Sequence, residues 1–264
     1  MESGKAETVL SVLKARRDFL EAVSDRPLTQ AELADEVGVS RSTVTRAVRT
    51  LEDEELIARE DGKYTITTLG SATYRSYEGY VETVESLLEG RAFLRYVPPS
   101  SPFHPDLLRV GEVSLTEPGR AFSIRERVNE RFREAVAMDG LGRTRSARQS
   151  LPIIRDKVLE EGRPTRMVLD EDLFRYLRTE LAGTGFFTAE NQELSVVEEA
   201  PYGLFVLDSG EKETVVLVVY DETDSMKGVL ESESPRAIRW AREVLEDFDE
   251  AAVPVDELSD RRPV

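Results

Sequence analysis

The hydrophobic positions between residues 29 and 56 repeat with helical spacing and predict two short helices separated by a tight turn. Thr29 can cap the first helix, and Glu32 three residues later completes a capping box. Gly38 permits the turn, and Ser40 is a suitable N-cap for the second helix. The buried face of that second helix is formed by Val44, Ala47, Val48 and Leu51. This pattern predicts a helix-turn-helix.

The opposite face of the second helix is polar and basic. No acidic residue lies between Ser40 and Leu51, and the face carries Arg41, Ser42, Thr43, Thr45, Arg46 and Arg49. Arginine can contact a guanine edge or a phosphate, and small hydroxyl residues let a helix sit deep in the major groove. We therefore expect double-stranded DNA, an operator, at this face. The alternative is an ordinary helical hairpin whose polar face is only solvated.

After the second helix, hydrophobic and polar residues alternate with a period of two, which predicts a β-hairpin. Residues 57–59 and 64–67 would form its strands, and Asp-Gly between them is a strong turn signal. Helix-turn-helix plus hairpin is the winged-helix plan, in which Arg59 and Lys63 near the wing tip would meet phosphate or the minor groove. One packing helix is expected over residues 6–23. The DNA-binding domain is expected to span residues 1–68.

Residues 69–90 predict a helix that links this domain to the rest of the chain. Its hydrophobic residues lie three and four apart, as in the seam of two paired helices: Tyr74, Tyr77, Val81, Val84 and Leu88. One short recognition helix reads few base pairs, and such readers usually dimerise. We therefore expect a homodimer joined along this seam. The alternative is that the helix only packs on the second domain.

From residue 91 to 252 the pattern changes to short strands and amphipathic helices, which predicts an α/β domain around a mixed sheet, and so an α+β or α/β chain overall. Helices are expected at 123–138, 152–161, 171–181 and from Ser234-Pro235 onward. Strands are expected at 167–169, 194–197, 202–207, 215–220 and 228–230, with a strand pair or strand-turn at 107–115. The polar tail, residues 253–264, is expected to be loose.

Composition narrows the functional classes. The 264 residues include no cysteine, which excludes disulfides and thiolate metal sites. No hydrophobic run is long enough to span a membrane and no secretory signal is evident, so we expect a cytoplasmic protein without a membrane partner. Phosphate-binding glycine motifs, a nucleophile elbow and metal-spaced histidines are missing. We therefore expect no enzyme, catalytic residue, metal or cofactor, and a structural role for the lone His104.

The charge balance is unusual for a DNA-binding protein. The chain has 52 acidic and 35 basic residues, and its net charge is -17. Lysine accounts for six of the basic residues and arginine for 29. Such acid-rich, lysine-poor composition is typical of halophilic proteins, in which a negative surface maintains solubility. In about 1 M salt the Debye length is only about 3 Å, so distant repulsion from DNA is screened. The alternative is an ordinary acidic cytosolic protein.

Two parts of the chain resemble known families. The stretch A-E-L-A-D-E-V-G-V-S-R-S-T-V-T-R-A-V-R-T-L-E resembles the winged helix-turn-helix of archaeal transcriptional regulators, particularly those of halophilic archaea. P-D-L-L-R-V-G-E-V near 105, L-P-I-I-R-D-K-V-L-E-E-G near 151 and P-Y-G-L-F-V-L-D near 201 resemble the sensor domain of methanogenesis-regulator-type, TrmB-related transcription factors. So does K-G-V-L-E-S-E-S-P-R-A-I-R-W-A-R-E-V-L near 227. This resemblance implies a domain that senses a signal, often a small molecule. Related sugar-responsive regulators have a phospholipase-D-like fold, whose catalytic H-x-K pair is absent because Pro105 and Asp106 follow His104.

Charge is uneven within the expected sensor domain. Residues 120–180 hold fourteen basic and eleven acidic residues, whereas residues 181–264 hold seven and twenty. An acid-free stretch with interleaved hydroxyls carries Arg143, Arg145 and Arg148. Arginine and hydroxyl donors suit phosphate or carboxylate groups, which favours an anionic effector such as a sugar phosphate. The alternative is that these arginines balance neighbouring acids or touch DNA phosphates.

Together these features predict a sequence-specific DNA-binding transcriptional regulator whose DNA affinity responds to a small-molecule effector. The alternative function is a ligand-independent architectural or interaction protein that binds DNA.

Overall fold

The computed structural model describes residues 3–116, 121–143 and 150–259. The chain divides into two compact units, Met1–Val84 and Glu85–Val264. Helix α5 contributes residues to both.

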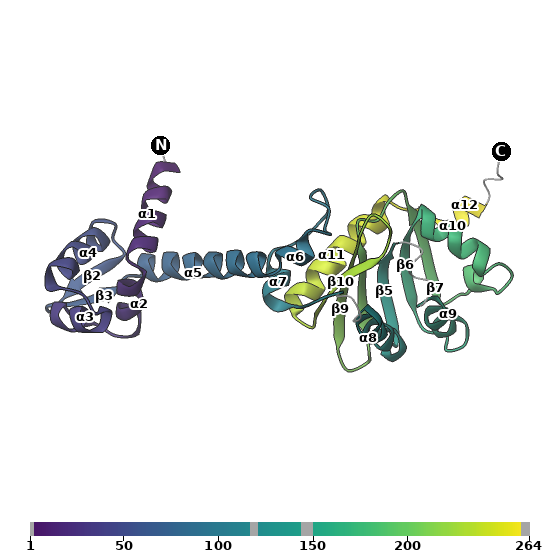
Figure 1. Cartoon of the computed structure of the whole chain (residues 1–264), viewed down its shortest axis with the longest axis horizontal. Helices are drawn as coiled ribbons and strands as arrows, with labels where there is room; N and C mark the ends of the chain where they lie inside the picture. The colour runs from purple at the N-terminus through teal and green to yellow at the C-terminus, as the bar shows by residue number, and fades with distance from the viewer. Residues whose placement is uncertain (1–2, 117–120, 144–149, 260–264) are drawn as a thin grey trace. The chain divides into compact units, whose positions relative to one another are not determined.

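The first unit is a winged helix-turn-helix (Figure 1). Its elements are α1 (Ser3–Ala15), α2 (Arg17–Asp25), β1 (Leu28–Thr29), α3 (Gln30–Val37), α4 (Arg41–Asp53), β2 (Ile57–Glu60), β3 (Lys63–Ile66) and the first part of α5 (Thr68–Glu89). The strands form a sheet in the order β1-β3-β2. Its core contains the four residues of α4 that were predicted to be buried, Val44, Ala47, Val48 and Leu51.

The local signals that predicted the helix-turn-helix are confirmed. The Thr29 hydroxyl accepts a hydrogen bond from the Glu32 amide, and the Glu32 carboxylate accepts one from the Thr29 amide at 2.7 Å. The hydrogen bond from the Thr29 amide to this carboxylate is the main cause that lowers the pKa of Glu32. Gly38 adopts the left-handed conformation, with φ of +69°, and the Ser40 hydroxyl accepts from the Thr43 amide. The first backbone amides of a helix have no acceptor within the helix. The hydroxyls of Thr29 and Ser40 accept hydrogen bonds from one such amide in α3 and one in α4.

The wing is a tight antiparallel hairpin, as expected. Ile57 pairs with Ile66 and Glu60 with Lys63. Asp61 and Gly62 at the turn have φ of +48° and +80°. Positive φ at both central residues is the turn geometry that matches the twist of the flanking strands, and Asp-Gly favours it.

The single helix predicted over residues 6–23 is wrong, because α1 ends at Ala15 and α2 begins at Arg17. The break falls at Arg16, whose φ and ψ are −129° and 23°. Leu13 and Leu20 are both buried and lie seven residues apart, so the hydrophobic pattern stays in phase across the break. Spacing alone therefore could not reveal it.

The second unit is an α/β domain. After the end of α5 its elements are α6 (Arg91–Leu94), α7 (Asp106–Val110), β4 (Glu112–Leu115), α8 (Ala121–Glu134), β5 (Ala137–Gly142), α9 (Leu151–Leu159), β6 (Thr165–Asp170), α10 (Glu171–Glu180), the 3-10 helix η2 (Phe186–Thr188), β7 (Gln192–Val197), β8 (Gly203–Asp208), β9 (Glu213–Tyr220), β10 (Met226–Ser232), α11 (Pro235–Ala251), β11 (Val253–Pro254) and α12 (Val255–Ser259). Among the described residues, eight strands form one sheet in the order β11-β7-β6-β5-β8-β9-β10-β4. Strands β5, β6 and β7 pair in parallel and their other neighbours pair antiparallel, which confirms the predicted mixed sheet.

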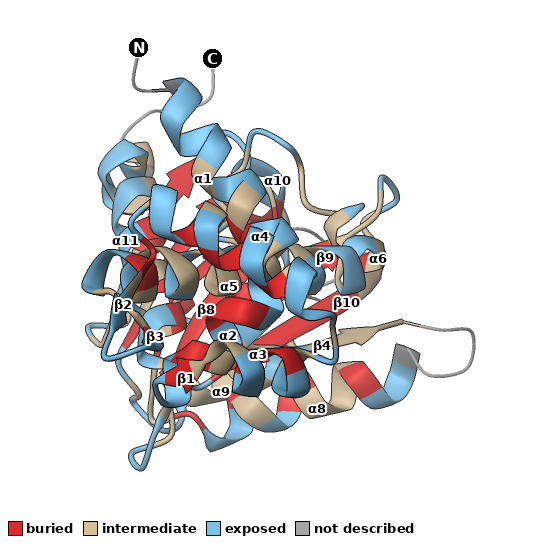
Figure 2. Ribbon diagram, turned by 90° about the vertical axis from the view of Figure 1, so that its left-hand side faces the viewer, coloured by how far each residue is buried: buried red, intermediate tan, exposed pale blue. Residues whose placement is uncertain are grey.

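The sheet is buried on both faces. Alternate residues of β8 separate into two clusters, with Leu204 and Val206 on one face and Phe205 and Leu207 on the other. Helix α11 covers the first face, and α8, α9 and α10 cover the second (Figure 1). Figure 2 shows β8 and β10 buried along most of their length. Burial on both faces explains the nearly continuous hydrophobic run of β9.

Several boundaries predicted for this unit are wrong. Leu107 belongs to helix α7, and only Glu112–Leu115 of the expected 107–115 strand pair forms a strand. The helix expected over 123–138 ends at Glu134, and Met138 lies in β5. Strand β5 was missed because its sequence, Ala-Met-Asp-Gly-Leu-Gly, has weak strand propensity. Gly140 is needed there, since a Cβ would lie 2.5 Å from the Phe205 ring.

The segment after Ala252 is also better structured than expected. Val253 pairs with Val196 of β7, and Val255 at the start of α12 is 5% exposed. Val255 supplies the buried side chain, whereas Val253 is 37% exposed and contributes the backbone pairing with β7. Within the described residues, no helix is both long and apolar enough to cross a membrane.

Candidate nucleic-acid interface and ligand cavity

Helix α4 presents one exposed basic face. The side chains of Arg41, Arg46 and Arg49 are exposed, as are Ser42 and Thr45. Thr43 is half-buried, and its amide and hydroxyl both contact the Ser40 hydroxyl in the cap. The three arginines form no ion pair with any residue in the described part of the chain. Their guanidinium groups are therefore available to an external anion or acceptor.

A residue that sequence reasoning missed lies against this face. Gln30, the first residue of α3, donates a hydrogen bond from its side-chain amide to the Thr45 hydroxyl at 2.6 Å. The Thr45 hydroxyl in turn donates to the Arg41 carbonyl at 2.9 Å. The amide of Gln30 thus fixes the orientation of a hydroxyl at the centre of the exposed face. The sequence signal that could have identified Gln30 is its position directly after the Thr29 cap, at the first residue of α3.

The wing carries both predicted cations at its surface. Arg59 and Lys63 are exposed, and the Arg59 guanidinium stacks over the Tyr64 ring at 5.6 Å from the centroid. Tyr64 is buried, so this contact holds the Arg59 side chain against a fixed platform. Glu60 and Asp61 at the tip are exposed as well. Attraction to DNA at the wing must therefore come from the placement of individual cations, because the wing has no excess of positive charge.

A run of acidic residues lies at the C-terminal end of α4. Residues 1–68 contain ten basic and fourteen acidic residues. The acidic run 52–55 begins in the last turn of α4, which ends at Asp53, while Arg41 and Arg46 occupy its first turns and middle. From Arg46 to Glu54 the helix rises about 12 Å. That distance exceeds the Debye length of about 8 Å at physiological salt, so Glu54 is largely screened from Arg46, whereas Arg49 lies only three residues from Glu52.

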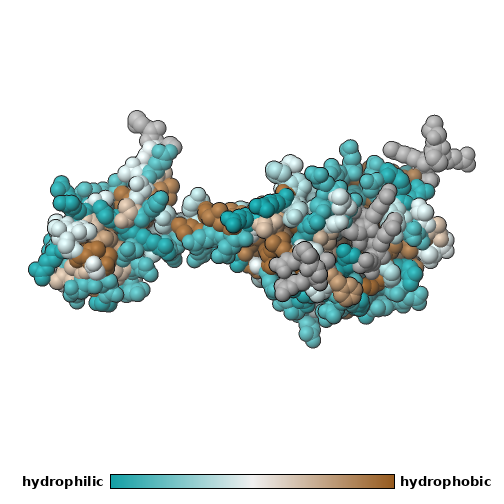
Figure 3. Space-filling model, viewed as in Figure 1, coloured by the Kyte–Doolittle hydropathy of each residue, from teal (hydrophilic) through white to brown (hydrophobic). Residues whose placement is uncertain are grey.

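The expected dimer seam on α5 divides into two parts. Tyr74 and Tyr77 are half-buried against the core of the first unit, and burial raises the pKa of Tyr74. Val81 and Val84 are partly exposed, and Leu88 is 60% exposed. Figure 3 shows hydrophobic residues at the surface of α5. Tyr80, which is 65% exposed, was not among the expected seam residues.

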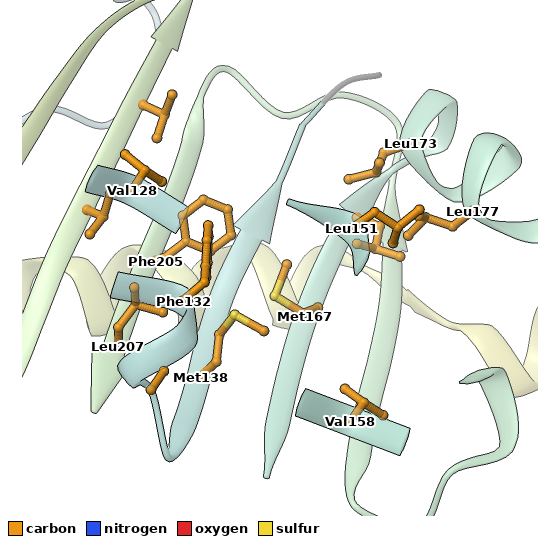
Figure 4. Packing of buried hydrophobic residues seen from close by; sticks show 14 of the residues in the cluster. Val128, Phe132, Met138, Leu151, Val158, Met167, Leu173, Leu177, Phe205 and Leu207 are labelled. Atoms are coloured by element: carbon orange, nitrogen blue, oxygen red, sulfur yellow. The ribbon is translucent and has the colours of Figure 1, made fainter. Parts of the chain in front are cut away.

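The second unit contains an apolar cavity of about 60 Å³ between the sheet and helices α8, α9 and α10. Figure 4 shows the packing around it, where Phe132 of α8 meets Phe205 of β8 edge to face with ring centroids 5.0 Å apart. Met167 of β6 also lines the space. Among the residues that the structure describes, two charged ones reach it, Arg125 of α8 and Arg143 directly after β5.

Of the three arginines expected to bind an effector, the structure places Arg143 at this cavity. Its guanidinium donates to the Pro201 carbonyl at 2.8 Å and lies 3.8 Å from the Asp224 carboxylate. Arg145 and Arg148 lie outside the described residues. Arg125 was missed, because an arginine on an amphipathic helix has the sequence pattern of a solvated face. In the structure its Nε is buried and lacks a hydrogen-bond partner among the described residues.

The remaining candidate groups have local roles. The Asp106 amide donates to Nδ1 of His104 at 3.2 Å, at the start of α7. Across the described ranges, no group of three or more histidine, aspartate or glutamate side chains could hold a metal ion.

Solved structures resemble the chain distantly. TrmBL2, described as an archaeal chromatin protein with a novel mode of DNA binding, is 18% identical over 86% of this chain and 87% of that chain, with a TM-score of 0.41. Polyphosphate kinase from Porphyromonas gingivalis is 12% identical over 63% and 27%, with a TM-score of 0.35. The S-adenosylmethionine-dependent methyltransferase SibL is 17% identical over 74% and 63%, with a TM-score of 0.26. Similarities this weak do not bear on what this chain binds. No curated protein matches it.

Two family models match the chain, one in each unit. Residues 5–89 match the HVO_A0261 N-terminal domain. Residues 121–251 match the middle domain of the methanogenesis regulatory protein FilR1. The chain therefore combines an N-terminal domain of the HVO_A0261 type with a middle domain of the FilR1 type.

Proposed function

We propose that the chain is a sequence-specific DNA-binding transcriptional regulator, with α4 as its recognition helix. The observation that carries this proposal is the exposed face of Arg41, Arg46 and Arg49, which has no ion-pair partner in the described part of a chain of net charge -17. A solvated structural face in so acidic a chain would be expected to pair its arginines. Ser42 and Thr45 between them are small enough for close approach to base edges.

The wing supplies a second contact in this proposal. Arg59, steadied by the Tyr64 ring, and Lys63 would neutralise phosphates beside the groove that α4 occupies. Phosphate contacts fix position and register, whereas contacts from α4 to base edges carry the sequence preference. The family models support the regulator class, because one matches a domain of a methanogenesis regulatory protein.

Two further features belong to the same proposal. The chain would act as a homodimer joined along α5, with Val81, Val84 and Leu88 at the seam, and each copy would read one half-site. A small anionic effector would bind in the second unit and change DNA affinity, with Arg143 at the cavity as one of its contacts. Coupling of this kind is reciprocal, so DNA would change effector affinity by the same factor.

Selection of bound fragments from a random DNA library, followed by footprinting, tests the proposal. We expect one enriched motif, two copies of which are protected, and competition by that motif far stronger than by unrelated DNA. Enrichment of no motif, with equal binding to all fragments, would refute sequence-specific regulation and favour an architectural DNA-binding protein. No binding at several salt concentrations would refute the DNA-binding assignment itself.

A further inference from the structure

We propose that the cavity of the second unit binds a small monoanionic carboxylate with an apolar body, such as an aryl or branched aliphatic acid. This rests on the proposed regulatory function and names the chemistry of its effector. The proposed ligand differs from the sugar phosphate expected from the arginine-rich stretch, because its body is a hydrocarbon and its head group is a carboxylate.

The lining of the cavity specifies the body of the ligand. Its walls belong to the hydrophobic cluster on the α8–α10 side of the sheet and include Phe132, Phe205, Leu173 and Leu177 (Figure 4). Sugar hydroxyls placed among these side chains would lose their hydrogen bonds to water, and each would be destabilised by roughly 1–3 kcal/mol. Apolar atoms in the same place gain from leaving water. The walls therefore favour a hydrocarbon body over a sugar.

The cavity can widen to admit such a body. Its volume of about 60 Å³ is smaller than the void of about 150 Å³ that suffices for benzene. Met167 and Met226 both line it. Methionine is unbranched and changes rotamer readily, which lets a site adapt to the shape of its occupant. The expected ligand is accordingly small.

Arg125 specifies the head group. Its Nε is buried without a hydrogen-bond partner among the described residues, and its side chain lines the cavity. A buried unsatisfied donor is unfavourable, and native structures contain few of them. A carboxylate in the cavity would accept this hydrogen bond, and a charge-assisted bond of this kind is stronger than a neutral one.

The strand pairing places Arg143 at one edge of the sheet. Arg143 directly follows β5, at the carboxyl end of the parallel strands β5 and β6. On the antiparallel side, Leu141 pairs with Leu204, which brings the start of β8 and the Pro201 carbonyl beside Arg143. Ligands of open α/β sheets bind in the crevice outside these carboxyl ends. Arg143 thus lies where the fold leaves room for a ligand head group, and Arg125 lines the same cavity.

Charge favours a carboxylate over a phosphate. Arg125 and Arg143 are the charged residues among the described residues that line the cavity, and both are positive. The Asp224 carboxylate, 3.8 Å from Arg143, compensates one of these charges. One positive charge remains, which a carboxylate balances. A phosphate monoester carries about 1.5–2 negative charges at neutral pH and would leave an excess.

Thermal-shift and calorimetric titration of the full chain test the proposal. The probes are straight-chain, branched and aryl carboxylates, the primary amide of each, and glucose 6-phosphate. Arg125→Gln removes the guanidinium, and Arg133→Gln is its matched control. Arg133 lies on the same helix and pairs with Glu126 at the surface, 2.7 Å away, so the control loses the same charge outside the cavity.

We expect at least one carboxylate to stabilise the wild-type chain while its amide does not. Arg125→Gln should weaken that binding about tenfold or more, and Arg133→Gln should leave it unchanged. The melting temperature without ligand should not fall in Arg125→Gln, because the substitution removes an unsatisfied donor. Equal binding of carboxylates and amides, equal loss in both variants, or tighter binding of glucose 6-phosphate would overturn the proposal.

Motif binding by the ligand-free chain is measured alongside, and it separates this proposal from the regulatory one. A chain that binds its DNA motif but no carboxylate refutes the cavity assignment alone. A chain that binds a carboxylate through Arg125 but no DNA refutes the regulatory function and leaves the cavity chemistry standing.

Discussion

Gly70→Ala should destabilise the first unit, because the start of α5 packs directly on the backbone before the wing. A Cβ at Gly70 would lie 1.9 Å from the Leu56 carbonyl oxygen and 3.1 Å from Cγ1 of Ile66. The nearest atom belongs to the backbone and cannot rotate away, so either α5 or the backbone at Leu56, just before β2, must move. That movement would also strain the Thr67 hydroxyl, which donates to the Glu55 carbonyl at 2.7 Å and accepts from the Gly70 amide at 2.9 Å.

The expected loss is about 2–4 kcal/mol, combining overpacking of about 1–3 kcal/mol with a weakened cap worth about 1 kcal/mol. For a unit of this size, 1 kcal/mol shifts the melting temperature by about 4–8 °C, so the melting temperature should fall by roughly 8–32 °C. Gly79→Ala is the matched control in the same helix, because a Cβ at Gly79 meets nothing within 4 Å. It should stabilise the unit by about 0.5–1 kcal/mol, since alanine loses less backbone entropy in a helix than glycine.

Thermal unfolding followed by far-UV circular dichroism and by tryptophan fluorescence separates the two units. Trp240 is the single tryptophan and lies in the second unit, so its transition should stay in place in both variants. The dichroism transition of the first unit should fall in Gly70→Ala and rise slightly in Gly79→Ala. Equal melting of the two variants would refute the contact between α5 and Leu56. A matching shift of the tryptophan transition would show that the units unfold together.

Replacing Arg59 or Lys63 with alanine should weaken DNA binding with little change in sequence preference, and each should reduce the salt slope of log affinity by about 1 in anisotropy titrations. Light scattering should show that the wild-type chain is a dimer and that Leu88→Asp is a monomer, and footprints should show half-sites roughly 34–36 Å apart. A wild-type chain that binds DNA as a monomer would contradict the dimer. Hydrogen bonds from Lys227, then from Thr223 and the Ser225 amide, lower the pKa of Asp221. Its stabilising contribution is therefore present above the ordinary carboxyl pKa and is lost as pH falls toward the folded-state value. In urea unfolding, the free energy of unfolding should fall less steeply with decreasing pH in Asp221→Asn than in the wild type. An equally steep fall in both would contradict this role of Asp221.

The features predicted correctly from sequence depend on neighbours in the chain. The capping box at Thr29, the left-handed turn at Gly38 and the Asp61-Gly62 hairpin each follow from backbone preferences of a few consecutive residues. Strand β9 was also predicted correctly, because a strand that is buried on both faces is hydrophobic at nearly every position.

The errors come from elements that tertiary contacts decide. Strand β5 contains Gly140 because the Phe205 ring of another strand occupies the space of a side chain. Val253 forms a strand because β7 offers it a free edge. Neither partner is near in sequence, so propensity and periodicity favoured other structures.

The sites were predictable to different extents. The exposed face of α4 followed from helical periodicity, because its members are consecutive turns of one helix. The cavity could not be predicted, since its walls come from helices and strands spread over the second unit. The acid-free stretch identified Arg143, but Arg125 on α8 and Gln30 beside α4 acquire their roles only from contacts made in the fold.

Binding of the selected DNA motif by an Arg46→Ala, Arg49→Ala double variant tests the central claim most directly. Lys14→Ala, Arg26→Ala is the matched control, because it removes the same charge from exposed positions outside α4. The α4 variant should lose about 1–3 kcal/mol per base-reading arginine and less for one that touches phosphate, with its melting temperature unchanged. The control should bind within a few-fold of wild type. Wild-type affinity in the α4 variant, or equal loss in the control, would contradict the assignment of α4 as the recognition helix.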